Sequence, residues 1–198
     1  MGIVSNDGHV SDNFKQLAIL GEDIPILDLS PFLSGTPGAA TTTASVLRHA
    51  LERTGFFYLV NHRIDIRLRD RMFALTAAFF DKPLSQKMPL KINQHGIGYV
   101  PRRGQFLRTS QYYTGTRKPD ACEAFLLQRD WGPGSDNREN PWPSRIPLFQ
   151  DTARKFFDAT EDLAVRMLPL YSLALGLQPE YFDGLFEKFK ALTVLRVS

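Results

Sequence analysis

The hydrophobic pattern centres on one short run of residues to which the preceding chain leads. Five apolar residues, Phe56 to Val60, follow Gly55 and precede the pair Asn61-His62. This run is too short for a helix and is rich in aromatic and β-branched residues, which favour strands. The pattern therefore predicts a strand that is buried on both faces.

Three other segments repeat apolar residues at the three- and four-residue steps of an amphipathic helix. The first should begin at a capping threonine, Thr42 or Thr43, and end at Gly55. Its expected apolar face consists of Val46, Leu47, Ala50 and Leu51. The second covers residues 66–80, and Pro83 follows its end. Its apolar stripe consists of Leu68, Met72, Leu75 and Phe79.

The third and longest helix is predicted over residues 149–175. Apolar or small residues recur along it at Phe149, Ala153, Phe156, Thr160, Leu163, Met167, Leu170 and Ala174. Pro169 lies inside this segment and should bend the helix, because proline cannot donate the helical hydrogen bond. Gly176 is a suitable exit, and Pro179 can open a short helix through Phe182.

Three further segments have the composition of strands. Residues 24–29 are apolar around Pro25, which indicates an edge strand because proline cannot donate to a ladder. Residues 122–127 and 192–198 also read as strands. Together the elements predict an α+β fold in which helices pack on an incomplete β-sheet. We expect residues 1–21 to be a tail and residues 22–198 to be one domain.

Composition narrows the class of protein. The formal net charge is +3, and basic and acidic residues are nearly balanced, so a dedicated nucleic-acid-binding protein is not expected. Cys122 is the only cysteine, which excludes an internal disulfide and a multi-cysteine zinc site. We expect Cys122 to be a small buried strand residue. No membrane-spanning or signal-peptide pattern is present, so a cytoplasmic location without membrane contact is expected.

Seven short motifs occur in an order that points to a known family. They are IPILDL at 24–29, GFFYLVNH at 55–62, FF at 79–80, GYVP at 98–101, EAF at 123–125, NPWP at 140–143 and VLRVS at 194–198. In this order and spacing the chain resembles the N-terminal region of the isopenicillin N synthase-like family of non-haem iron(II), 2-oxoglutarate-dependent dioxygenases. The resemblance covers about residues 24–198. It implies the N-terminal part of a double-stranded β-helix, or jelly-roll, oxygenase.

The resemblance also implies where iron would be held. In the family, a His-x-Asp pair and a distal histidine bind Fe(II) and leave positions for 2-oxoglutarate and oxygen. None of the four histidines, His9, His49, His62 and His95, is followed two residues later by an acidic residue. We therefore expect the chain to be truncated before the iron-binding half, to bind no cofactor alone and to be inactive alone. Fe(II) and 2-oxoglutarate would belong to a full-length oxidoreductase that acts on a small molecule.

The irregular segment from Lys91 to Pro119 carries the predicted substrate-binding residues. Glycines interrupt it, and long loops of this kind are often functional. By resemblance, the corresponding segment lines the substrate entrance, which selects Tyr99, Arg102, Arg103 and Arg108. Arginines here can clamp a carboxylate or phosphate, so an anionic substrate is one option. A solvated basic loop accounts for the same arginines equally well.

Three residues have expected structural roles. His62 should close the turn after the central strand through ring hydrogen bonds, and Glu123 should be a buried partner of Arg117 or Lys118. Arg63 stands where the family usually has glycine. If that turn requires a positive φ, Arg63 costs about 1 kcal/mol relative to glycine.

A second function class remains open. An incomplete sheet has an open edge with an apolar face, and such an edge favours strand addition or self-association. The alternative hypothesis is therefore a non-catalytic protein that binds a partner through this edge.

Overall fold

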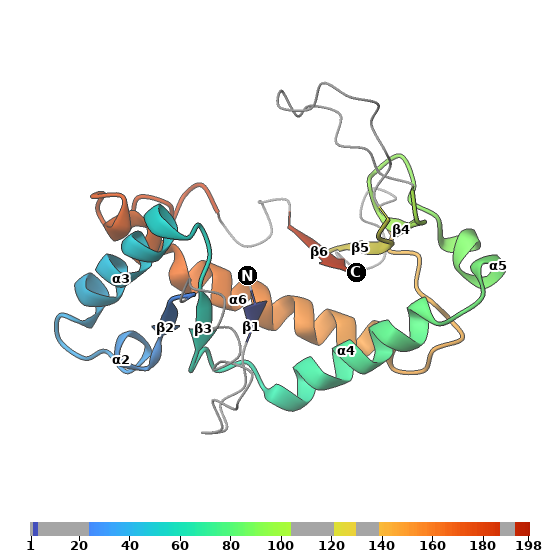
Figure 1. Ribbon diagram of the computed structural model, residues 1–198, viewed down its shortest axis with the longest axis horizontal. Coiled ribbons are helices and arrows are strands. Elements are labelled where there is room, and N and C mark those ends of the chain that lie inside the picture. Colours follow the sequence, from blue (N-terminus) through green and yellow to red (C-terminus); the bar gives the residue numbers. More distant parts are fainter. Residues whose placement is uncertain (1, 4–23, 104–120, 130–138, 187–192) are drawn as a thin grey trace. The chain divides into compact units, whose positions relative to one another are not determined.

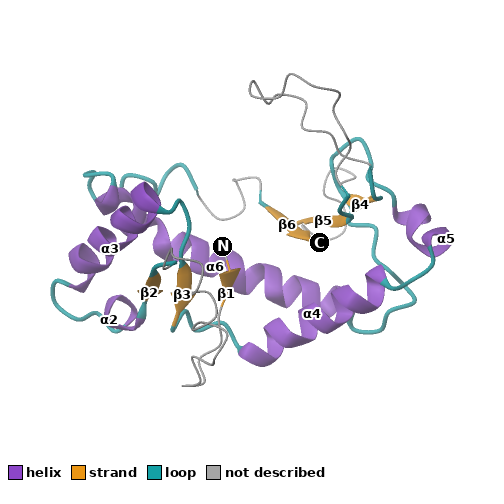
Figure 2. Ribbon diagram, viewed as in Figure 1, coloured by secondary structure: helices purple, strands orange, loops and turns teal. Residues whose placement is uncertain are grey.

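The computed structural model describes residues 2–3, 24–103, 121–129, 139–186 and 193–198 (Figure 1). The helices are α2 (Ser30–Leu33), α3 (Ala39–Arg53), α4 (Ile66–Phe80), α5 (Leu84–Lys87), the 3-10 helix η2 (Met88–Leu90) and α6 (Phe149–Ala174). The strands are β1 (Gly2–Ile3), β2 (Ile26–Asp28), β3 (Tyr58–Val60), β4 (Gly98–Val100), β5 (Ala124–Gln128) and β6 (Val194–Val197) (Figure 2).

The chain divides into two compact units. One comprises Met1–Ile66 with Thr160–Ala191, and the other comprises Arg67–Ala159 with Leu192–Ser198. Each unit has its own three-stranded sheet. The boundary that we predicted at residue 21 lies outside the described residues, since residues 4–23 are not among them.

The first unit contains a parallel sheet in the order β1-β3-β2. Its central strand is β3, as predicted, but burial on both faces was wrong. Leu59 is fully buried, whereas Tyr58 and Val60 are half-buried and Phe56, which precedes the strand, is 53% exposed. Side chains alternate across a strand, so β3 buries one face well and leaves the other partly open. The edge position of β2, which follows Pro25, is confirmed.

Helix α3 begins earlier than the threonines suggested. It starts at Ala39, after Gly38 with a φ of 76°, and no side chain caps it. The residues buried along it are Ala39, Thr43, Ala44, Leu47 and Ala50, whereas Val46 and Leu51 are exposed. The predicted face was therefore rotated by about one residue. Gly55, with a φ of 81°, ends the helix as predicted, and its amide donates to the Ala50 carbonyl.

The first unit differs from the prediction in two short segments: it has a helix that was not predicted, and it lacks a helix that was. Helix α2 follows β2 directly, with Pro31 in its first turn, where the missing N–H costs nothing. The helix expected from Pro179 to Phe182 was wrong, because residues 179–185 form successive turns.

The second unit contains an antiparallel sheet in the order β4-β5-β6. Strands β5 and β6 confirm the prediction to within two residues, and α4 confirms it at both ends. Strand β4 lies in a segment that we predicted to be irregular. Three residues are too few to show a hydrophobic period, so the strand was missed.

An aromatic cluster joins the elements of the second unit. The Phe79 ring of α4 lies 4.8 Å from Phe125 of β5, 5.8 Å from Tyr99 of β4 and 6.1 Å from Phe149 of α6. All four side chains are at most 2% exposed. This cluster fixes α4 and the start of α6 against the second sheet, which confirms helices packed on a sheet.

Helix α6 confirms the longest predicted element. Seven of the eight predicted stripe positions are buried, Thr160 being half-buried. The helix ends in a Schellman motif: the Leu177 amide donates to the Ser172 carbonyl, and the Gly176 amide donates to the Leu173 carbonyl. Gly176 has the positive φ of 76° that this motif requires. Among the described helices, α6 included, none combines the length and hydrophobicity that spanning a membrane demands.

Candidate functional site

Strand β4 begins at a glycine, Gly98, where any side chain would push neighbouring backbone atoms away. Gly98 has a φ of 120°, and a Cβ built on it would lie 2.6 Å from the Leu90 carbonyl oxygen. This close approach brings η2 against β4, where the Ile92 amide donates to the Tyr99 carbonyl at 2.8 Å. Tyr99 therefore has little freedom to move along or away from the sheet.

Tyr99, Glu123 and Lys87 form a buried polar cluster. The Tyr99 hydroxyl donates to Glu123 Oε2 at 2.5 Å, and Lys87 Nζ donates to the same oxygen at 2.8 Å. Lys87 also donates to the Phe80 carbonyl at 2.7 Å. The side chains of Lys87 and Glu123 are 7% and 17% exposed, and Tyr99 is 1% exposed. The cluster ties α5 to β4, to the residue before β5 and to the last residue of α4.

The cluster shifts the protonation equilibria of two of its members. Burial by itself raises the pKa of Glu123, but hydrogen bonds from Lys87 and Tyr99 outweigh it and leave the pKa below its ordinary value. Burial, together with the Glu123 carboxylate, raises the pKa of Tyr99 well above its ordinary value. Glu123 is therefore a carboxylate near neutral pH, and Tyr99 remains a hydrogen-bond donor.

The partners predicted for Glu123, Arg117 and Lys118, lie outside the described residues, so that pairing stays a prediction. Among the described residues, Glu123 forms an ion pair with Lys87. The buried structural role predicted for Glu123 agrees with this geometry. Lys87 itself was missed, because its partner is 36 residues away and nothing local in sequence marks that pairing.

The four predicted substrate-binding residues have different positions. Tyr99 points into the packed interior and has its hydroxyl occupied by Glu123. Arg102 and Arg103 are exposed in the turn after β4, and Arg103 has a positive φ of 61°. Arg108 lies outside the described residues. The structure thus places two arginines at the surface, three and four residues after a buried tyrosine.

The turn after β3 has the geometry that we expected. His62 is 6% exposed, and its Nδ1 accepts a hydrogen bond from the Ile64 amide at 3.1 Å. Arg63 has a φ of 64°, which confirms the positive φ, and it donates to the Leu33 carbonyl at 3.0 Å. Asn61, with a φ of 55°, donates to Asp28 at 2.8 Å. Burial alone raises the pKa of Asp28, but hydrogen bonds from Ser30 and Asn61 have the larger combined effect and leave this pKa below its ordinary value.

Cys122 differs from the prediction. Its side chain is exposed, not buried, because β5 begins only at Ala124. Arg196 Nη2 lies 3.8 Å from its sulfur.

We tested whether the described residues suit an iron site. In the part of the chain that the structure describes, no three His, Cys, Asp or Glu side chains are grouped so that they could hold a metal ion. His62, the most buried described histidine, already uses Nδ1 in the turn, and His49 and His95 are exposed. These residues do not fit the histidine and carboxylate set that binds iron in the resembled family.

Comparison with known proteins identifies the family. The profile of the family described as "non-haem dioxygenase in morphine synthesis N-terminal" matches residues 24–145, which is more than half of the chain. The chain belongs to the non-haem iron(II), 2-oxoglutarate-dependent dioxygenase family. The match covers the N-terminal region of this dioxygenase family, as the motifs predicted.

Individual relatives agree with this assignment. The 2-oxoglutarate-Fe(II) type oxidoreductase hxnY of Emericella nidulans is 30% identical over 82% of this chain and 49% of its own length. The clavatol oxidase claD of Penicillium crustosum is 27% identical over 88% of this chain and 56% of its own. A full-length Neurospora crassa protein, solved in complex with alpha-KG and thymine, is 26% identical, with a TM-score of 0.70 over 87% of this chain and 54% of its own. This dioxygenase chain spans about half the length of the curated relatives that it matches.

Proposed function

We propose that this chain supplies the N-terminal scaffold and part of the substrate entrance of an iron(II)- and 2-oxoglutarate-dependent oxidoreductase that acts on a small molecule. Iron and 2-oxoglutarate would be bound by residues other than those that the structure describes. Alone, the chain would not turn over 2-oxoglutarate. Family membership supports the reaction class. The described residues contain no group of side chains that could hold iron, which supports placing the iron ligands elsewhere.

One observation carries the assignment of the entrance. Arg102 and Arg103 are exposed directly after a strand whose tyrosine is anchored by a buried carboxylate. Within the described residues, neither arginine makes an ion pair, although the charge of Arg102 helps to lower the pKa of Glu123. In this proposal both guanidinium groups face an anionic group of the substrate. Tyr99 holds the turn in place, and Arg102 and Arg103 contact the substrate. Arg108, the fourth predicted contact, lies outside the described residues.

The names of the relatives agree with a small-molecule substrate. One relative is a homoarginine-6-hydroxylase of Arabidopsis thaliana, and the structure of the Neurospora crassa relative contains thymine. Both names describe compact polar molecules. The arginines narrow this class toward substrates with a carboxylate or phosphate.

The experiment joins residues 24–198 to the C-terminal half of the Emericella nidulans relative and measures succinate formation with Fe(II) and 2-oxoglutarate. A panel of small carboxylic acids and the matching amides serves as candidate substrates. We expect acids to stimulate succinate formation more than amides do, and Arg102→Gln with Arg103→Gln to remove this preference. Equal stimulation by acids and amides in a folded, iron-loaded chimera would contradict the anionic assignment.

A second function is favoured by the edge of the second sheet. Within the described residues, β6 pairs only with β5, and its residues are half-buried or exposed. An edge strand can accept a strand from a partner or from a second copy. Light scattering on the purified chain tests this alternative: a defined dimer supports it, and a stable monomer at high concentration argues against it.

A further inference from the structure

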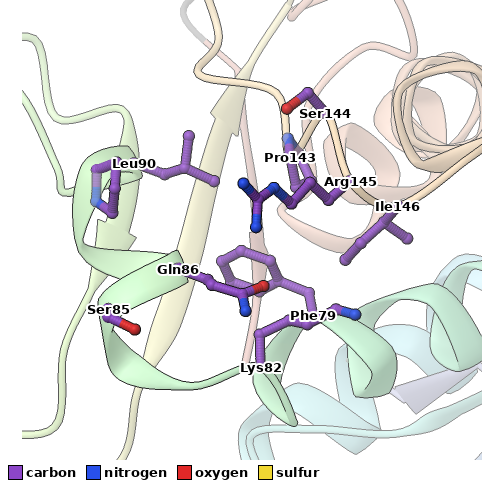
Figure 3. A pocket seen from close by; sticks show the side chains of 10 residues that line it. Phe79, Lys82, Ser85, Gln86, Leu90, Pro143, Ser144, Arg145 and Ile146 are labelled. Atoms are coloured by element: carbon purple, nitrogen blue, oxygen red, sulfur yellow. The ribbon is translucent and has the colours of Figure 1, made fainter.

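The second unit contains a pocket that involves none of the four predicted substrate-binding residues. It has a volume of about 280 Å³ and lies between the end of α4, the α5–η2 segment and residues 143–146 (Figure 3). This volume is just below the range of about 300–1,000 Å³ that is usual for small-molecule sites in proteins. The pocket is therefore suited to a compact metabolite.

The floor of the pocket is apolar and rigid. Phe79, Pro143 and Ile146 line it, and all three are buried. Phe79 is also the centre of the aromatic cluster, with its ring 4.8 Å from that of Phe125. An aromatic ring or a short aliphatic chain of a ligand would find a preformed surface here.

The rim of the pocket is positively charged. Among the described residues, Lys82 and Arg145 line it, together with the polar side chains of Ser85, Gln86 and Ser144, and no acidic side chain does. Figure 3 shows the Arg145 side chain extending over the pocket toward Phe79 and Gln86. Among the described residues, neither Lys82 nor Arg145 has an ion-pair partner. Two cations without an ion pair to any described residue, above an apolar floor, favour a ligand with one anionic end.

The walls are held in place by hydrogen bonds. On one side the Ile146 amide donates to the Pro143 carbonyl at 3.0 Å. On the other side the Gln86 amide donates to the Pro83 carbonyl at 2.9 Å, and Lys87 fastens α5 to the Phe80 carbonyl at 2.7 Å. These hydrogen bonds hold the backbone of both walls, so binding a ligand would mainly require ordering of the side chains at the rim.

We propose that this pocket binds a small organic monocarboxylate, with the carboxylate on the Arg145 guanidinium and the apolar body against Phe79. Lys82 adds a second positive charge at the rim. The site goes beyond the entrance function proposed above and does not depend on it, since it needs neither iron nor 2-oxoglutarate.

The test titrates the 198-residue chain with phenylacetate, phenylacetamide and inorganic phosphate, and follows binding by ligand-detected NMR. We expect phenylacetate to bind with a Kd of about 1 mM or below, and phenylacetamide to bind about tenfold more weakly, since it lacks the charge that pairs with Arg145. Phosphate should bind more weakly than phenylacetate because it cannot use the apolar floor. Arg145→Gln should weaken phenylacetate binding about tenfold, and adding Lys82→Gln should weaken it further.

Arg71→Gln is the matched control. Arg71 is an exposed arginine on α4 that does not line the pocket, so its loss should leave phenylacetate binding unchanged. Circular dichroism of each variant verifies that it is folded. Absence of phenylacetate binding at about 10 mM would overturn the proposal. Equal affinity for acid and amide, tighter binding of phosphate, or an Arg145→Gln variant that binds like the wild type would each overturn it too.

Discussion

The Lys87 ammonium group lies 2.8 Å from Glu123 Oε2, and this ion pair is buried where α5 meets the second sheet. The same carboxylate oxygen accepts the Tyr99 hydroxyl, so a single atom connects three segments of the chain. Because Arg102 and Arg103 follow Tyr99 so closely, this ion pair also fixes the base of the turn that we assign to the substrate entrance.

Removing one member of this ion pair should lower the free energy of unfolding substantially. Lys87→Met leaves the Glu123 carboxylate buried without its counter-charge, so we expect the free energy of unfolding to fall by about 3 kcal/mol. Lys155 pairs with Asp151 at 2.9 Å, but both side chains are more than half exposed. Lys155→Met should therefore cost less than about 1 kcal/mol. Urea denaturation measures both, and equal losses would show that the buried pair contributes no more than the exposed one.

Because the pKa of Glu123 is lowered, the folded protein should lose stability at acidic pH. A carboxyl group with a folded-state pKa below its unfolded value stabilises the protein above the unfolded value, which is 4.5 for glutamate. That contribution is lost as the pH falls below about 4.5 and through the folded-state pKa. We expect Glu123→Gln to flatten this part of the stability curve. Some dependence of the unfolding free energy on pH should remain in the variant, since the pKa of Asp28 is also lowered. Urea denaturation between neutral and acidic pH tests this, and an unchanged slope in Glu123→Gln would refute it.

At position 63, glycine should give a more stable protein than alanine. At a φ of 64°, Arg63→Gly and Arg63→Ala both lose the hydrogen bond to Leu33, but only alanine retains the strain. The glycine variant should therefore be the more stable of the two by about 1 kcal/mol. At Arg71, inside α4, the order should reverse by a similar amount, about 1 kcal/mol in favour of alanine. Thermal unfolding of the four variants gives both differences, and the same order at both sites would exclude strain at Arg63.

Gly98 should tolerate no side chain. Gly98→Ala places a methyl group 2.6 Å from the Leu90 carbonyl oxygen at a φ of 120°. We expect a loss of more than about 2 kcal/mol in unfolding free energy, from steric overlap and backbone strain together. Gly176 has a φ of 76° but nothing within 4 Å of an added Cβ. Gly176→Ala should therefore cost only about 1 kcal/mol, and similar losses at the two positions would mean that η2 yields to the added methyl group.

Local patterns predicted the long elements, and tertiary context decided the rest. The bounds of α4 and the buried stripe of α6 follow from periodicity over many residues. Strand β4 and helix α2 have three and four residues, too few to show a period. The start of α3 was misplaced because Gly38 opens it without a side-chain cap. Tyr99 was selected by resemblance as a substrate contact. Its hydrogen bond to Glu123, which also binds Lys87, was missed because no local pattern connects these three residues.

The central proposal is that the iron-binding residues of a full-length protein lie outside the residues that the structure describes, and that this chain alone is a scaffold. The most direct measurement incubates the purified chain with Fe(II), ascorbate, oxygen and 2-oxoglutarate and quantifies succinate, with the Emericella nidulans relative as positive control. We predict succinate from the relative and none above the protein-free background from this chain. Succinate that this chain forms in an iron-dependent manner, and that a chelator abolishes, would contradict the account.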